Sequence, residues 1–396
     1  MRHRLFIEEC GLISPLGRGK SETAHRLFGP PRDWFSERDD LVPGRRVAVG
    51  AVDGPLPSPP ATLSSQDSRN NRLMAAALEE IRPAIDAAVA RLGRQRIAVV
   101  LGTSTSGMAD GEEALSTFRK RGAWPAAFDY RRQEVGSLAG FVADLLGLTG
   151  PAYTIATACS SSAKVFASAR RLIAAGLADA AIVGGADTLC RMTLNGFASL
   201  EALSKTRCNP FSRNRDGITI GEGAAAFLLS RQQGPVELLG IGETSDAFHA
   251  TAPDPEGAGA GAAMAQALDD AGLVPEQIAY INLHGTGTPL NDAMESKAVA
   301  SLFPSSTPCS STKGMTGHML GATGGVEAAF LWLALNPATS QGVLPAHLWD
   351  GQPDPALPAL TLATCGTAIP PTGRRAMLSN SFGFGGNNVS LILGSA

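Results

Sequence analysis

Cys159 stands in a sequence context that suits a nucleophile. It belongs to the stretch 154–176, TIATACSSSAKVFASARRLIAAG, in which a short apolar run leads to the cysteine and three serines. Side chains at helical spacing then continue to Gly176, which predicts a helix that begins near the cysteine. A thiol at a helix N-terminus faces unpaired backbone N–H groups and the positive end of the helix dipole, and both favour the thiolate. A small buried core residue is the alternative.

Two histidines lie in glycine-rich stretches that are typical of active-site rims. His284 stands in NLHGTGTPLND, where Thr286 and Thr288 present hydroxyls and the glycines let the backbone approach a ligand closely. His318 stands in STKGMTGHMLGATGG, with Lys313 shortly before it. Small residues around a polar group at a strand end favour a functional loop. For each histidine alone, a hydrogen-bonded structural imidazole is the alternative.

A third glycine-rich turn lies near the end of the chain. In LSNSFGFGGNNVSLIL, glycines surround Phe384. Such a turn lets consecutive backbone N–H groups point at one spot, as in an oxyanion hole. Taken by itself, the turn fits a tight hairpin equally well.

The elements around these stretches are those of an α/β protein. Apolar runs predict buried strands near residues 4–9, 46–52, 97–107, 180–187, 227–230, 236–244, 279–285, 360–363, 375–381 and 388–393, with helical patterns between many of them. Because this alternation occurs twice, we expect two comparable α/β halves with parallel-rich sheets. The first half, residues 1–234, carries Cys159, and the second, residues 235–396, carries both histidines and the Phe384 turn.

Composition excludes several classes of function. The 396 residues, of which 44% are hydrophobic and 45 are glycine, suit a well-buried enzyme. A net charge of −3 provides no overall field for nucleic acid or an anionic membrane. No apolar run is long enough to span a membrane, and the start of the chain does not resemble a secretion signal. The six cysteines are scattered without a CxxC pair, which argues against zinc and disulfides and favours a cytoplasmic location.

Several sequence blocks together carry a family resemblance. TACSSS, HGTGTPLND, STKGMTGHMLGATGGVEA and NSFGFGGNN occur in this order, with GLISPLG near the start and RNRDGITIGEGAAAFLLS before the middle of the chain. This set resembles the β-ketoacyl-acyl carrier protein (ACP) synthases of the elongating type I/II, within the thiolase-like superfamily. The resemblance covers essentially the whole chain. It implies a thiolase-like fold of two similar α/β halves, layered α-β-α-β-α.

The resemblance also implies a reaction, a decarboxylative Claisen condensation that yields 3-oxoacyl-ACP. Cys159 would hold the acyl group as a thioester, because a thiol exchanges readily with an acyl thioester. His284 and His318, as neutral imidazoles, would donate Nε2–H to the enolate formed when malonyl-ACP loses carbon dioxide. The backbone N–H groups of Cys159 and Phe384 would hold the oxyanion of the tetrahedral intermediates. No bound cofactor or metal is implied, since the substrates are carried on the phosphopantetheine of ACP.

Further residues receive supporting roles from the same resemblance. Lys313 matches the active-site lysine, with an electrostatic role, and Glu327 matches the acidic residue that pairs with it. A solvent-facing helix glutamate is the alternative for Glu327. Thr105 matches a position that helps to set the depth of the acyl pocket. Thr286 and Thr288 match positions that bind the pantetheine arm, Phe384 matches a gating ring, and Asn387 stands where the usual block has threonine.

Partners follow from the carrier and from the family. Because an ACP is acidic, the docking face should be locally basic, and candidate residues are Arg69, Arg72, Arg119, Lys120, Arg121, Arg131 and Arg132. The family implies a homodimer, or a heterodimer with a related synthase or chain-length-factor subunit. Two stretches, CSSSAKVFASARRL and CNPFSRNRDG, resemble the corresponding sequences of aryl-polyene-type synthases more than those of housekeeping fatty-acid synthases.

Other functions on the same fold fit less well. A chain-length factor lacks the cysteine, whereas Cys159, both histidines and Lys313 are present here. A degradative thiolase needs a second active-site cysteine on the C-terminal glycine loop, where this chain has Phe384. An initiating synthase pairs cysteine with histidine and asparagine, which the GHMLG block contradicts. A ketosynthase subunit that works only beside a chain-length-factor-like partner stays open as the alternative.

Overall fold

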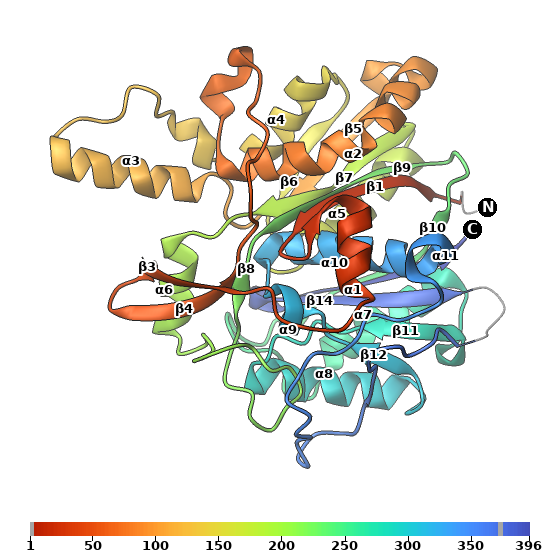
Figure 1. The fold of residues 1–396 in the computed structure, drawn as a ribbon. Helices are drawn as coiled ribbons and strands as arrows, with labels where there is room; N and C mark the ends of the chain where they lie inside the picture. The colour runs from red at the N-terminus through yellow and green to blue at the C-terminus, as the bar shows by residue number, and fades with distance from the viewer. Residues whose placement is uncertain (1–3, 371–374) are drawn as a thin grey trace.

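The computed structural model describes residues 4–370 and 375–396. The N-terminal half of the protein is built on a mixed sheet (Figure 1). Its strand order is β1-β9-β7-β5-β6. The bounds are β1 Phe6–Ser14, β9 Gly223–Ser230, β7 Ala180–Asp187, β5 Ile97–Gly102 and β6 Ala152–Ile155. β7, β5 and β6 run parallel, whereas β9 is antiparallel to both β1 and β7.

The C-terminal half repeats this order in β10-β15-β14-β11-β12 and adds β13 at the edge. The bounds are β10 Val236–Ser245, β15 Asn387–Ser395, β14 Ala376–Gly383, β11 Ile278–Asn282, β12 Pro308–Ser310 and β13 Thr361–Leu362. β10, β15 and β14 are antiparallel neighbours, and β14, β11, β12 and β13 are parallel. Both sheets are therefore mixed, and the expectation of parallel-rich sheets was wrong for the strands nearest the junction of the halves, where β1, β9 and β7, and β10, β15 and β14, pair antiparallel. β1 and β10 join the halves through two residue pairs.

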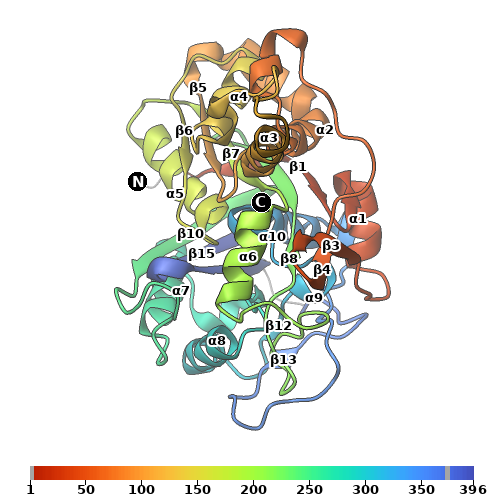
Figure 2. The ribbon, with the colours of Figure 1, turned by 90° about the vertical axis from the view of Figure 1, so that its left-hand side faces the viewer.

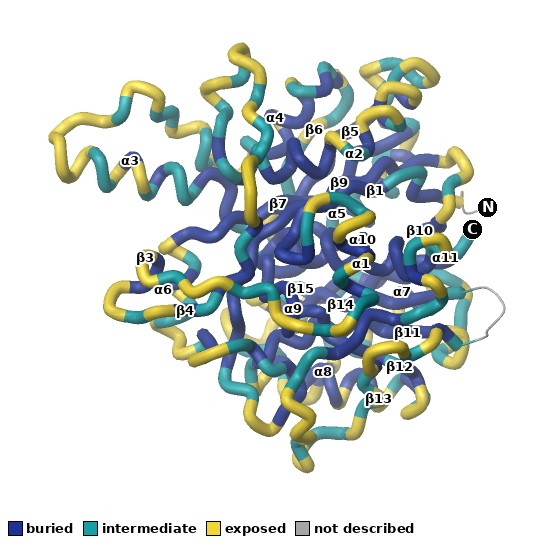
Figure 3. Tube along the Cα trace, viewed as in Figure 1, coloured by how far each residue is buried: buried dark blue, intermediate teal, exposed yellow. Residues whose placement is uncertain are grey.

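Helices cover both outer faces and fill the space between the sheets, so the layers follow the expected α-β-α-β-α order (Figure 1). The outer helices are α2 Arg69–Leu92 and α4 Ser137–Leu146 on the N-terminal sheet, and α7 Ala258–Ala271 and α8 Pro289–Leu302 on the C-terminal sheet. The middle layer holds α5 Ser161–Ala174 and α10 Thr323–Leu335. Every residue of α10 is buried, which agrees with a sequence that is apolar on all sides except at Thr323 and Glu327 (Figure 3).

Several elements lie outside the predicted alternation. α6 Arg191–Ser199 lies beside a small sheet of β3 Ser36–Val42, β4 Arg45–Gly50 and β8 Ile220–Gly221 (Figure 2). The remaining short elements are α1 Gly19–Leu27, β2 Gly17–Arg18, α9 Lys313–Thr316 and α11 Pro337–Ser340. Within the described ranges, no helix has the length and apolar character that a membrane crossing requires.

One helix projects from the body of the molecule. α3, Met108–Arg121, extends away from the N-terminal half with most of its surface exposed (Figures 1 and 3). Phe118 of this helix stacks on Trp124, which stacks in turn on Phe128. Both Phe118 and Trp124 are exposed. An aromatic stack at the solvent boundary is typical of a protein interaction surface.

Candidate active site

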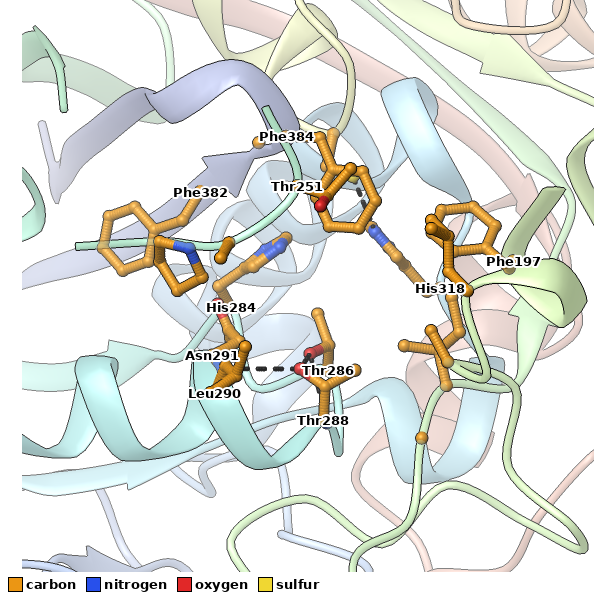
Figure 4. Close-up of a pocket in the computed structure, with 18 of the residues that line it drawn as sticks. Phe197, Thr251, His284, Thr286, Thr288, Leu290, Asn291, His318, Phe382 and Phe384 are labelled. Carbon is orange, nitrogen blue, oxygen red and sulfur yellow. Dashed lines mark hydrogen bonds between the residues drawn. The ribbon is translucent and has the colours of Figure 1, made fainter. Parts of the chain in front are cut away.

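Four chain segments bring the predicted reactive groups to one cavity of about 280 Å³ (Figure 4). Cys159 lies between β6 and α5, His284 follows β11, His318 lies between α9 and α10, and Phe384 follows β14. The thiol sulfur and one ring nitrogen from each histidine all lie within 4.8 Å of one another. The structure thus places residues from both halves of the chain around a single point.

The loop before α5 holds Cys159 in a tight turn. Ala158, directly before it, has a left-handed backbone with φ of 50°, a conformation that a non-glycine residue rarely adopts. The Ser161 hydroxyl donates to the Ala158 carbonyl at 2.6 Å, and the Ser160 hydroxyl donates to the Thr157 carbonyl at 2.8 Å. The serines that follow the cysteine therefore stabilise the turn that presents the thiol.

Burial determines the protonation of the thiol. It raises the pKa of Cys159 to about 11, although the Lys313 cation and the backbone N–H of Phe384 pull the pKa in the opposite direction. The sequence predicted that a helix N-terminus would favour the thiolate. In the structure, burial acts on the pKa in the opposite direction to the helix end, and the thiolate form of Cys159 stays a prediction.

His318 contacts Cys159 directly. Its Nε2 lies 2.9 Å from Cys159 Sγ, and its Nδ1 lies 3.0 Å from Thr323 Oγ1 at the start of α10. The backbone N–H of His318 donates to the Thr219 carbonyl at 2.7 Å. Burial, and secondly the Lys313 cation, hold the pKa of His318 well below its usual value of about 6.5. The imidazole is therefore neutral at physiological pH.

His284 is held through its backbone by a buried carboxylate that the sequence analysis missed. Glu295 of α8 accepts hydrogen bonds from the N–H groups of His284 and Gly285, both at 2.7 Å, and from Asn380 Nδ2 at 3.2 Å. Burial lowers the pKa of His284 well below its usual value and raises that of Glu295 to about 7. The two imidazole rings stand nearly perpendicular, with centroids 5.3 Å apart. The only signal for Glu295 was an acidic residue on an otherwise buried helix face.

Lys313 and Glu327 form an ion pair beneath the site. Their Nζ and Oε1 atoms lie 2.5 Å apart, and both side chains are completely buried. Glu327 is therefore not a solvent-facing helix residue. Lys313 does not line the cavity, yet its charge acts on the pKa of Cys159 and of both histidines. An ammonium group in this place acts on the site electrostatically.

The cavity wall carries the two predicted threonines and three phenyl rings, those of Phe197, Phe382 and Phe384. Thr286 Oγ1 and Thr288 Oγ1 lie 2.9 Å apart on the cavity side of the His284 loop (Figure 4). Phe384 packs against Phe197 of α6 with ring centroids 5.5 Å apart, and it is 37% exposed. Phe197 is a second residue that the sequence did not indicate. Hydroxyls beside apolar rings suit a ligand with both amide and aliphatic groups.

The same centre has the ligand types of a zinc site. Thiol and imidazole groups are common zinc ligands. One ligand atom from each of Cys159, His284 and His318 lies within 4.8 Å of the other two. A structural zinc ion needs a fourth ligand, and metal binding deprotonates the thiol. The expectation of no metal therefore stays a prediction.

Some predicted residues lie elsewhere or are already engaged. Thr105 is buried but is not among the residues that line the cavity. Two docking candidates pair within the chain, Arg69 with the buried Glu222 and Arg72 with Asp67, each at 2.5 Å. Arg131 pairs with Asp129 but keeps 72% of its side chain exposed. Of these three arginines, Arg131 is thus the most available to a partner.

Comparison with known proteins agrees with this geometry. The model of the β-ketoacyl synthase N-terminal domain matches residues 62–234, and that of the C-terminal domain matches residues 236–348. The chain is 35% identical to 3-oxoacyl-[acyl-carrier-protein] synthase 2 of Staphylococcus aureus over 320 residues, 75% of this chain and 76% of that protein.

Solved structures give the same result. The ketosynthase structure of ApeO, in complex with its chain length factor ApeC, from Xenorhabdus doucetiae matches with a TM-score of 0.94 and 48% identity, over 100% of this chain and 98% of that one. The ishigamide ketosynthase/chain length factor matches with a TM-score of 0.87 and 28% identity over the full length of both chains. The protein therefore belongs to the β-ketoacyl synthase family, the carbon–carbon bond-forming acyltransferases known as 3-oxoacyl-ACP synthases.

Proposed function

We propose that this enzyme extends an acyl group held on Cys159 by decarboxylative condensation with malonyl-ACP. The observation that carries the proposal is the contact of 2.9 Å between Cys159 Sγ and His318 Nε2, with His284 beside them in a buried cavity. A nucleophile and a nitrogen base at hydrogen-bond distance are the basic requirement of covalent acyl transfer.

In the first step, the acyl group moves from its carrier to Cys159. The sulfur attacks the thioester carbonyl, the new C–S bond forms, and the bond to the pantetheine sulfur breaks. The thiol proton leaves through His318 Nε2, which is unprotonated in this step while Nδ1–H donates to Thr323 Oγ1, and it ends on the departing pantetheine thiol. The backbone N–H groups of Cys159 and Phe384 stabilise the oxyanion of the tetrahedral intermediate.

In the second step, malonyl-ACP replaces the first carrier. Its C–CO2 bond breaks, carbon dioxide leaves, and the enolate oxygen receives Nε2–H donation from His284 and His318. For His318 this requires the other tautomer, in which the proton has moved from Nδ1 to Nε2 and Nδ1 accepts a hydrogen bond from the Thr323 hydroxyl; the contact of 3.0 Å permits both arrangements. The enolate carbon attacks the acyl carbon, Cys159 leaves as thiolate, and it takes up one proton.

The substrate side of the cavity suits a pantetheine arm. Thr286 and Thr288 supply hydroxyls for its amide groups, while Phe384 and Phe197 close over the acyl thioester. Lys313 acts on this site as a buried cation, and Glu327 holds it in place. We propose that no resident cofactor takes part, and that the carrier's phosphopantetheine delivers both substrates.

The proposed partners are an ACP and a second chain of the same fold. The exposed residues Arg119, Lys120 and Arg121 of α3, with Arg131 after it, offer positive charge to an acidic carrier. Phe118 of α3 stacks on Trp124 at the surface, and β6 is an edge strand of the sheet. Both features favour burial against another chain. Complexes of ketosynthase with chain length factor among the similar structures favour a related partner over an identical one.

Pathway and location complete the proposal. Identity of 48% to the ApeO ketosynthase, against 35% to the staphylococcal synthase, favours a specialised polyene or polyketide pathway over housekeeping fatty-acid synthesis. All six cysteines are free, and five are buried, which suits the reducing cytoplasm.

The boundary between the two halves of the chain, placed between residues 234 and 235, stays a prediction.

Intact-protein mass spectrometry after incubation with an acyl-ACP tests this function. The wild-type chain should gain the mass of one acyl group, and Cys159→Ala should gain none. Cys365→Ser is the matched control, because Cys365 is the exposed thiol, and it should acylate like the wild type. An adduct that forms only beside a co-expressed partner chain would support the partner-dependent alternative. An adduct that persists in Cys159→Ala would contradict the proposal.

A further inference from the structure

A fully buried carboxylate at the end of β7 connects two loops of the site. Asp187 Oδ1 accepts hydrogen bonds from Thr103 Oγ1 and Ser104 N, both at 2.8 Å, and from Thr105 N and Oγ1, both at 2.7 Å. Its Oδ2 accepts one from Ala322 N at 2.9 Å. One oxygen thus holds the turn after β5, and the other holds the residue directly before α10.

The turn after β5 also touches the loop that presents the nucleophile. Ser104 Oγ donates to the carbonyl of Ala158, the strained residue before Cys159, at 3.3 Å. On its other side the turn packs against the histidine loop so closely that a Cβ at Gly321 would lie 2.6 Å from Ser104 Oγ and 2.8 Å from Asp187 Oδ2. The turn therefore lies between the cysteine loop and the histidine loop.

From these contacts we infer that Asp187 is a positioning residue that sets the contact between Cys159 and His318. The inference rests on the proposed function, since it concerns the same two side chains. Asp187 acts through the turn after β5 on one side and through Ala322 on the other. Its own atoms do not line the cavity.

The chemistry of the network requires a carboxylate. All the groups that face Asp187 in these contacts are donors, and an ionised carboxylate accepts on both oxygens, whereas an amide accepts on only one. Burial of such a charge is costly unless hydrogen bonds compensate it, and this carboxylate receives several. A carboxylate kept in place at this cost favours a role that a neutral core residue would not fill.

The network also gives Thr105 a defined place. Its hydroxyl donates to Asp187 Oδ1 at 2.7 Å and accepts a hydrogen bond from the Thr188 N–H at 3.0 Å. The hydroxyl is therefore occupied inside the network. Its contribution to the depth of the acyl pocket stays a prediction.

The substitution Asp187→Asn tests the inference. Asparagine keeps the size of the side chain, but its NH2 group must face a donor, either Ala322 N–H or the turn after β5. We expect kcat for condensation, counted per chain that accepts an acyl group, to fall at least tenfold, with KM for malonyl-ACP within twofold of the wild type. Asp179→Asn is the matched control, because Asp179 lies just before the other end of β7 and pairs with Arg96 at the surface. It should keep the wild-type rate.

A second pair of variants covers the case in which Asp187→Asn does not fold. Thr105→Val removes one donor to Asp187 and should lower kcat three- to tenfold, whereas Thr105→Ser keeps the hydroxyl and should restore the rate. Wild-type kcat in Asp187→Asn, or equal rates in the two Thr105 variants, would overturn the inference. A wild-type chain that forms no acyl adduct would instead overturn the proposed function, and the inference with it.

Discussion

The two halves of the molecule share one strand order but contribute unequally to the site. In the C-terminal half, the segments after β12, β11 and β14 carry His318, His284 and Phe384. The equivalent segments of the N-terminal half follow β6, β5 and β7, and only the first carries a reactive side chain, Cys159. The segment after β5 is a turn that donates hydrogen bonds to Asp187, and Asp187 is the last residue of β7. One half thus supplies most of the groups proposed for catalysis, and the other supplies the proposed nucleophile and the network inferred to position it.

Removal of a C-terminal donor should have the largest effect. In His284→Ala, we expect condensation to slow by about 10²–10³-fold, the usual loss when one oxyanion donor is removed. Acylation of Cys159 should persist, because the pair of Cys159 and His318 is intact. His25→Ala, at an exposed histidine on α1, is the control. Equal loss of acylation and condensation in His284→Ala would contradict this division of labour.

Carrier docking should depend on the N-terminal half and should show a smaller effect. The double variant Lys120→Glu/Arg131→Glu should raise KM for malonyl-ACP about three- to tenfold at low salt, with kcat unchanged, because exposed charges mainly guide encounter. High salt should reduce the difference. Lys297→Glu places one such charge reversal on the C-terminal half and is compared with each single variant as well as with the double variant. If the variants on the two halves behave alike, α3 and Arg131 do not form the docking site.

The smallest effect concerns pH. Because burial lowers the pKa of both imidazoles well below 6.5, they stay neutral as the pH falls from 8 to 6. The condensation rate of pre-acylated enzyme should therefore change less than about twofold over this range, whereas an unshifted imidazole would be about three-quarters protonated at pH 6. Stopped reactions at several pH values measure this. Glu295, with a pKa raised to about 7, titrates in the same range, so a fourfold or greater decline toward pH 6 that persists in Glu295→Gln would show that the histidines titrate normally.

The side chains that the sequence singled out do come together, because each lies in a local motif at a strand end. Strand 180–187 was predicted with its observed bounds, since a continuous apolar run needs no knowledge of its neighbours. The pKa of Cys159, the burial of Glu327 and the pairing of Arg69 with Glu222 were not predictable in this way. All three depend on residues far apart in the chain. Glu295 and Asp187 were missed for the same reason, because they act on backbone groups that no sequence motif displays.

The central claim is that both halves form one condensing site around an acyl group on Cys159. It is tested most directly by measuring carbon dioxide and 3-oxoacyl-ACP together, after an acyl-ACP and malonyl-ACP are mixed with the enzyme and its partner chain. We predict one carbon dioxide for each 3-oxoacyl-ACP, a product two carbons longer than the acyl donor, and loss of this product in Cys159→Ala. Elongation that continues unchanged in Cys159→Ala would contradict the account.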